Sequence, residues 1–258
     1  MNLQNILNEI EQVDADMYDR LDHVSRRHVF SNFLKKAMAG AAPVAFAAIL
    51  NKSYAQNSSV ADVLNFALLL EYLEAEFYNK GLAAPGLIPA GVGRTVYTQI
   101  AKHENAHVAL LQSALGGAAI AKPAFDLTYK GAFADVLTNY QTYLAVSQAL
   151  EDTGVRAYKG QAGALISAPA VLTVALQIHS VEARHAARVR MLRGQKGYIV
   201  NADSGGVPAA VYAGEDNVTQ GGVNLVTATG MSAARVTEAF DEPLTKAQVL
   251  AIATPFLA

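Results

Sequence analysis

Two stretches of this sequence contain the same set of acidic and imidazole side chains at nearly the same spacing. The first stretch has Glu71 followed by Glu104-x-x-His107, and the second has Glu151 followed by Glu182-x-x-His185. The lone glutamate precedes the glutamate of the pair by 33 residues in the first stretch and by 31 in the second. A Glu and a His three residues apart lie on the same side of a helix, so each pair can bind one metal ion. We interpret the two stretches as an internal repeat.

Buried carboxylates need a counter-charge. Four ionised glutamates inside an apolar bundle would be too costly without one. Two adjacent divalent ions would neutralise them, with the two histidines completing six side-chain ligands. Carboxylate and imidazole together suit iron or manganese and leave open positions for oxygen species. The ligand types do not distinguish between the two metals.

Two tyrosines repeat with the glutamates. Tyr78 follows Glu71 by seven residues, and Tyr158 follows Glu151 by the same interval. Seven residues are two helical turns, so each tyrosine should share a face with its own glutamate. Both are candidates for a catalytic role in redox chemistry or for supporting the ligands, and the alternative is an ordinary core aromatic with a satisfied hydroxyl.

Other polar residues near the repeat have less specific interpretations. His179 lies one turn before Glu182 and either supports the metal ligands or lies at the surface. We expect helix-end or partner contacts for three arginines: Arg184, Arg188 and Arg190. We expect Glu74 and Glu76, beside Glu71, to be solvated.

A zinc protease motif overlaps the first Glu-x-x-His pair. His103, Glu104 and His107 form His-Glu-x-x-His, in which the histidines would bind zinc and the glutamate would act as base. A third ligand would be needed downstream, and no familiar protease spacing provides one. The second stretch has Val181 where His103 would correspond, which weighs against this alternative.

The residues with chemistry lie in four long helical patterns. Glycine and proline positions bound the patterns, which run over about 58–81, 94–115, 132–160 and 168–193. The predicted fold is all-α: a four-helix bundle of two antiparallel helix hairpins with a crossover. An irregular C-terminal extension, residues 194–258, should end in a short helix near 245–253. The bundle domain itself would span residues 56–193.

The N-terminal segment, residues 1–55, looks like an export signal. Ser25-Arg26-Arg27 precedes an apolar stretch over 37–50, and Ser53-Tyr54-Ala55 offers a small-x-small cleavage site. This set resembles a twin-arginine signal, and it predicts a periplasmic or otherwise exported protein. The alternative is an N-terminal helical arm that stays attached.

Composition excludes several classes of protein. The chain of 258 residues contains no cysteine, which removes disulfides, thiolate zinc sites and cysteine nucleophiles. The net charge is −2 and gives no sign of a nucleic-acid partner. Hydrophobic residues make up 52% of the chain, but the stretch over 37–50 is short for a membrane span. We therefore expect no span in the mature chain.

The ligand pattern resembles the ferritin-like di-metal carboxylate superfamily, which the four-helix arrangement suits. The surrounding stretches LNFALLLEYLEAEFY and AFDEPLTKAQVLAIATPF are similar to a bacterial branch related to desiccation-associated proteins. The motif covers residues 58–193, and the similarity to the branch extends to the C-terminus.

The resemblance implies two Fe or Mn ions and a small-molecule oxidant, oxygen or hydrogen peroxide. Glu71 and Glu151 would hold one ion each, Glu104 and Glu182 would bridge, and His107 and His185 would complete the ligand sets. Ferroxidase, peroxidase or catalase chemistry in stress protection would follow, in a possible homo-oligomer. The alternative is a non-enzymatic desiccation or stress protein on the same bundle. A cage-forming iron store fits less well, because the C-terminal extension would have to be accommodated in the shell.

Overall fold

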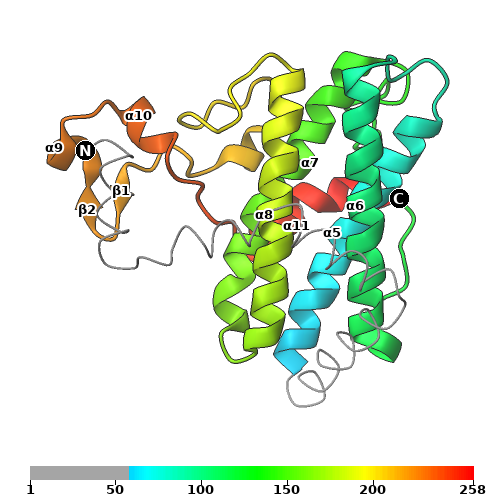
Figure 1. Cartoon of the computed structure of the whole chain (residues 1–258), viewed down its shortest axis with the longest axis horizontal. Coiled ribbons are helices and arrows are strands. Elements are labelled where there is room, and N and C mark those ends of the chain that lie inside the picture. Colours follow the sequence, from blue (N-terminus) through cyan, green and yellow to red (C-terminus); the bar gives the residue numbers. More distant parts are fainter. Residues whose placement is uncertain (1–57) are drawn as a thin grey trace, which may run out of the picture. The chain divides into compact units, whose positions relative to one another are not determined.

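Four long helices lie side by side in this computed structural model, which describes residues 58–258 (Figure 1). They are α5 (Ser58–Ala83), α6 (Val92–Leu115), α7 (Tyr140–Gln161) and α8 (Pro169–Leu192). Helix α5 packs mainly against α6, and α7 mainly against α8, so the bundle consists of two antiparallel hairpins joined by a crossover. The all-α four-helix bundle predicted from the sequence is therefore confirmed.

The crossover between the hairpins is longer than predicted. Helix α7 was expected to begin near residue 132, but it begins at Tyr140, where the side chain of Asn139 accepts a hydrogen bond from the Gln141 amide. The preceding residues form turns instead, and Tyr129 and Lys130 have φ values of 57° and 55°. These two residues precede the expected start, and residues 132–138 also form turns rather than helix, so the earlier start was wrong.

The end of the chain returns to this crossover. Phe125 and Leu257 form an antiparallel bridge, and the amide of Asp126 donates to the carbonyl oxygen of Phe256 at 2.7 Å. Lys130 also donates to the Leu257 carbonyl. These contacts hold the C-terminal segment against the crossover, because extended segments satisfy their backbone polar groups by pairing.

The C-terminal extension contains short elements only. They are the 3-10 helix η3 (Ala209–Tyr212), the antiparallel strands β1 (Thr219–Gln220) and β2 (Val223–Asn224), and the helices α9 (Leu225–Thr229), α10 (Ala233–Thr237) and α11 (Lys246–Ala253). Helix α11 begins with a capping box between Thr245 and Gln248, which satisfies backbone amides that the first turn leaves free. The last helix thus lies where the sequence placed it.

A buried cation attaches this extension to the bundle. Arg156 of α7 is fully buried and lies 2.8 Å from Glu215, and it also donates to backbone carbonyls that include that of Glu242. One turn further, a Cβ on Gly160 would collide with the carbonyl of Leu244, so only glycine permits this close approach. Apolar side chains of α5, α7, η3 and α11 form a shared core.

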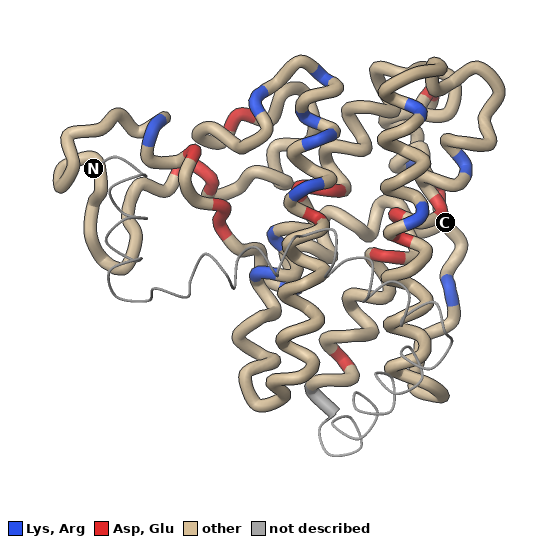
Figure 2. Tube along the Cα trace, in the orientation of Figure 1, with Lys and Arg blue, Asp and Glu red and all other residues tan. Residues whose placement is uncertain are grey.

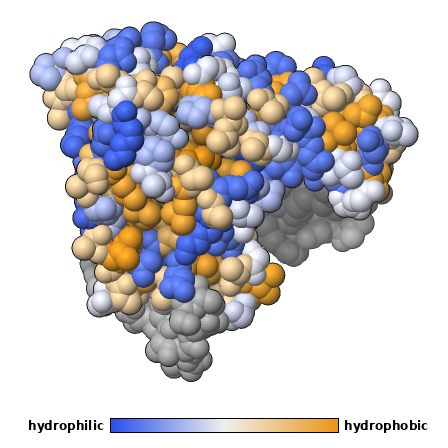
Figure 3. Space-filling model, turned by 180° about the vertical axis from the view of Figure 1, so that it is seen from behind, coloured by the Kyte–Doolittle hydropathy of each residue, from blue (hydrophilic) through white to orange (hydrophobic). Residues whose placement is uncertain are grey.

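Polar and apolar side chains share the surface that Figure 3 shows, interspersed over one face. Within residues 58–258 no helix is long and apolar enough to cross a membrane. The predicted signal, with Arg26, Arg27 and the cleavage site at Ala55, lies outside the described residues.

Candidate metal centre

The six residues of the repeat come together in the middle of the bundle. Helix α5 contributes Glu71, α6 Glu104 and His107, α7 Glu151, and α8 Glu182 and His185. The four carboxylates are 0% exposed, and the two histidines are 8% and 5% exposed. Figure 2 shows acidic positions at mid-height of the bundle helices. The three-residue spacing within α6 and α8 explains why the six side chains meet, because it turns the glutamate and the histidine of each pair inward.

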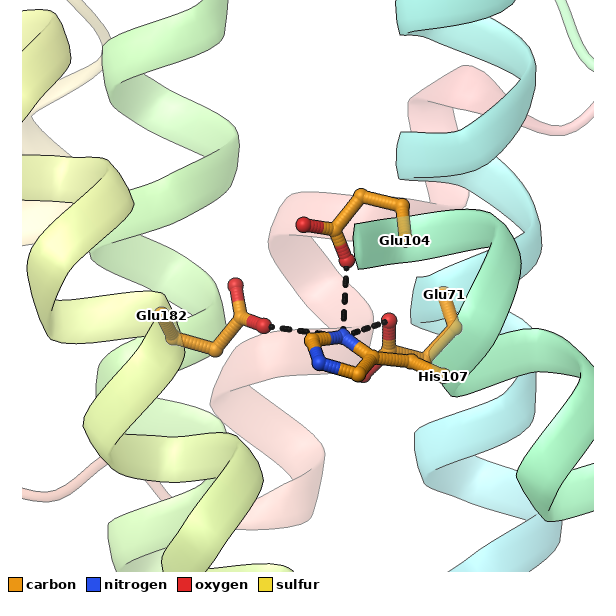
Figure 4. Close-up of side chains that lie close together, drawn as sticks. All are labelled: Glu71, Glu104, His107 and Glu182. Carbon is orange, nitrogen blue, oxygen red and sulfur yellow. Dashed lines mark hydrogen bonds and ion pairs between the residues drawn. The ribbon is translucent and has the colours of Figure 1, made fainter. Parts of the chain in front are cut away.

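His107 marks the first of two ligand groups (Figure 4). Its Nδ1 lies 3.1 Å from Oε2 of Glu71, 3.0 Å from Oε2 of Glu104 and 3.3 Å from Oε1 of Glu182. One ligand atom from each of these four residues lies within 4.8 Å of all the others. A single metal ion among them could therefore bind three carboxylates and one imidazole.

His185 marks the second group. Its Nδ1 lies 2.8 Å from Oε1 of Glu104, 3.3 Å from Oε2 of Glu151 and 3.9 Å from Oε2 of Glu182. Glu104 and Glu182 belong to both groups, and each turns one oxygen toward each histidine. These two carboxylates are thus placed between two neighbouring positions and can serve both.

Unpaired polar atoms test whether the donor set suits metal ions. Five buried atoms at this place lie close to one another but make no hydrogen bond of acceptable geometry within the described residues: Glu104 Oε1, Glu151 Oε2, Glu182 Oε1, Glu182 Oε2 and His185 Nδ1. Buried polar atoms are rarely left unpaired in folded proteins. Oxygen and imidazole nitrogen atoms that converge without partners are the donor set of iron and manganese. The residues fit metal ions.

Burial and mutual repulsion perturb the ionisation of the cluster. Burial, reinforced by the charge of Glu104, raises the pKa of Glu182 well above its ordinary value. Burial also raises the pKa of Glu104 to about 7. Burial alone would lower the pKa of His185, but the carboxylates of Glu151 and Glu104 raise it to about 11. Protons must therefore balance these charges when no metal is bound, so protons and metal ions compete for the cluster.

The two tyrosines connect the hairpins. Tyr78 of α5 donates to Oε1 of Glu151 on α7, and Tyr158 of α7 donates to Oε1 of Glu71 on α5 at 2.5 Å. From the sequence, each tyrosine was expected to share a face with the glutamate of its own helix. In the structure, the hydroxyl of each tyrosine instead reaches the glutamate of the other hairpin. Each bond orients a carboxylate of one ligand group. A redox role for Tyr78 and Tyr158 stays a prediction.

Glu74 is a buried carboxylate that the sequence analysis missed. It was expected at the surface with Glu76, but it is only 3% exposed, whereas Glu76 does pair with surface lysines. A Cβ on Gly154 would lie 3.3 Å from Oε1 of Glu74 and 3.2 Å from Oε2 of Glu182. Burial and the charge of Glu182 raise the pKa of Glu74 well above its ordinary value. Its three-residue spacing from Glu71 was the available signal.

The remaining polar residues lie elsewhere. His179 is half-buried, and its Nδ1 lies 3.0 Å from the carbonyl oxygen of Val155 rather than near a ligand. Arg190 lies in the last turn of α8, as expected, but it is buried there and pairs with Asp152 at 2.5 Å. Tyr212 of the extension donates to the same carboxylate at 2.5 Å. Arg184 and Arg188 are exposed.

His103 lies outside both ligand groups. Its Nδ1 is 2.8 Å from Nε2 of His185, on the side of that ring away from the carboxylates. Glu104, the base of the protease alternative, belongs to both groups. The geometry therefore favours the repeated Glu-x-x-His pairs over a His-Glu-x-x-His zinc site.

Comparison with known proteins agrees with this geometry. No curated protein matches the chain. A family model described as a ferritin-like domain matches residues 59–195, which include all six residues of the cluster. Because this match covers more than half of the chain and coincides with the four-helix bundle, the chain belongs to the ferritin-like domain family.

Proposed function

We propose that this protein binds a di-iron or di-manganese centre and acts on oxygen or hydrogen peroxide, as a ferroxidase, peroxidase or catalase in stress protection. The observation that carries the proposal is the pair of four-residue ligand groups that share Glu104 and Glu182. A shared pair of carboxylates suits two adjacent ions better than one.

The chain's own residues would hold and shield the centre. Glu71 with His107 would complete one position, and Glu151 with His185 the other. When bound, the metals would supply electron exchange with oxygen or peroxide. The protein would contribute fixed ligands, the tyrosine hydrogen bonds to two of them, and a buried site from which bulk water is excluded.

We also propose that the protein is exported in folded form. The support is the arginine pair at residues 26–27 followed by an apolar stretch and a small-x-small site. Twin-arginine export fits a protein that acquires its metals before it leaves the cytoplasm. N-terminal sequencing of the protein from fractionated cells tests this, because a start at Gln56 in the exported fraction is the expected result.

Metal content followed by turnover tests the main proposal. We would express the full chain with its own N-terminal segment, measure iron and manganese by elemental analysis, and assay consumption of hydrogen peroxide and oxidation of Fe(II). We expect close to two metal ions per chain and turnover of at least one substrate. The double variant Glu104→Ala/Glu182→Ala should lose both, whereas Glu76→Gln, which changes a carboxylate outside the cluster on α5, should lose neither.

Two results would count against this function. A metal content well below one ion per chain, with a double variant as stable as the wild type, would refute the metal centre. Full metal content without action on peroxide or Fe(II) would favour a non-enzymatic stress or desiccation protein in which the metals are structural.

A further inference from the structure

One of the two ligand histidines has a partner on the side away from the cluster. Nδ1 of His103 lies 2.8 Å from Nε2 of His185, and the two rings are stacked with centroids 5.1 Å apart. The other ring nitrogen of His103 lies 2.6 Å from the side-chain amide of Gln99, which is exposed. A short chain of polar groups thus runs from the surface of α6 to a ligand of α8.

The other ligand histidine has no equivalent support. No hydrogen bond from Nε2 of His107 is found within residues 58–258. The residue that corresponds to His103 in the second hairpin is Val181, which has no hydrogen-bonding side chain. The internal repeat is therefore broken at this position, and the surroundings of the two ligand histidines differ although the ligand types match.

We infer that His103 is a positioning residue that supports His185 and makes the two metal positions unequal. The inference rests on the proposed metal centre. A metal ion bound at Nδ1 of His185 leaves Nε2 as the N–H donor of that ring. Nδ1 of His103 then accepts this hydrogen bond, which fixes the tautomer and the orientation of the ligand ring. The remaining N–H of His103 donates to the Gln99 side chain, whose oxygen reaches it by rotation of the amide.

Loss of such a partner weakens metal binding about 10–100-fold in proteins. We therefore expect His103→Val, which copies the second hairpin, to raise one of two dissociation constants by about this factor and to leave the other nearly unchanged. His103→Asn should restore tight binding, because the asparagine oxygen can take the place of Nδ1 as acceptor.

Titration with Co(II) measures this without any turnover. Calorimetry gives the two dissociation constants, and the visible absorption of bound Co(II) reports its ligands. His179→Val is the matched control, because His179 is another half-buried histidine whose ring meets a backbone carbonyl instead of a ligand. It should leave both constants unchanged.

Two further backgrounds assign the effect to one position. In His107→Gln, where only the His185 position remains intact, His103→Val should weaken Co(II) binding about 10–100-fold. In His185→Gln it should have no effect. Equal effects in both backgrounds would overturn the inference.

The inference and the proposed function fail in different ways. If the wild type binds no Co(II), the metal centre itself is refuted. If the wild type binds two ions and His103→Val changes neither constant, only the role of His103 is refuted. Should the valine variant not fold, NMR of the wild type loaded with Zn(II) decides, because an exchange-protected Nε2–H of His185 supports the hydrogen bond and a rapidly exchanging one overturns it.

Discussion

Replacing Glu182 with glutamine should separate metal binding from stability. Glu182 is fully buried, neither of its oxygens accepts a hydrogen bond within the described residues, and it belongs to both ligand groups. Glutamine keeps the shape but not the charge. Burial of an unpaired carboxylate costs more than burial of an amide, so Glu182→Gln should be at least as stable as the wild type when both are free of metal. It should also lose much of its metal-dependent stabilisation.

The size of the metal-dependent stabilisation follows from the number of ions that the two ligand groups would bind. An ion that binds only the folded state, at 100 times its dissociation constant, stabilises it by about 2.7 kcal/mol. Two ions would add about 5 kcal/mol. For a chain of this size 1 kcal/mol shifts the Tm by about 2–4 °C, so metal should raise the wild-type Tm by about 10–20 °C. Because the substitution damages both positions, the variant should show less than half of that shift.

Thermal unfolding followed by circular dichroism is the assay. Wild type, Glu182→Gln and the control Glu76→Gln would each be measured with chelator and with saturating Mn(II). The control should respond to metal as the wild type does, because Glu76 pairs with Lys80 and Lys122 outside the cluster. A full metal-induced shift in Glu182→Gln would refute the reasoning, and so would a metal-free variant much less stable than the metal-free wild type.

Three further predictions concern the attachment of the extension and the tyrosines beside the cluster. Arg156→Met should lower the free energy of unfolding by about 3–5 kcal/mol in urea titrations, because it leaves Glu215 buried without its partner; an effect below about 1 kcal/mol would contradict this. Burial raises the pKa of Glu215 to about 7 from its ordinary 4.5, so the folded state binds the proton more tightly than the unfolded state, and stability should fall as the pH rises from 4.5 to 7. Glu215→Gln should make stability less dependent on pH in this window, and an unchanged slope would count against the assignment. Tyr78→Phe and Tyr158→Phe should each weaken Mn(II) binding about 10-fold without loss of helix content, and unchanged affinity by calorimetry would show that these hydroxyls do not position the glutamates.

The helices and the ligand set could be predicted because both depend on local spacing. Glycine and proline bound the helical patterns, and three of the four bundle helices begin and end close to the expected residues. The fourth, α7, was extended too far because residues 132–139 carry no strong break. The segment just before these residues pairs with the distant C-terminus, as in the hydrogen bond from the Asp126 amide to the Phe256 carbonyl. No local pattern reports such contacts.

Whether a charged side chain is buried depends on the groups that meet it from other elements, and its spacing along its own helix does not report them. Glu74 was expected to be solvated and Arg190 to make a helix-end or partner contact, yet both are buried. Arg190 is buried because Asp152 and Tyr212 meet it from another helix and from the extension. Only a folded chain brings these groups together.

The sequence by itself determined the four-helix pattern and the repeated ligand types, because helical periodicity places residues three apart on one face whatever surrounds them. Only the tertiary structure decided that Glu104 and Glu182 belong to both groups, that each tyrosine serves the opposite hairpin, and that His103 supports one ligand histidine alone. These features arise between helices, where the packing of the hairpins sets distances that no spacing along the chain specifies.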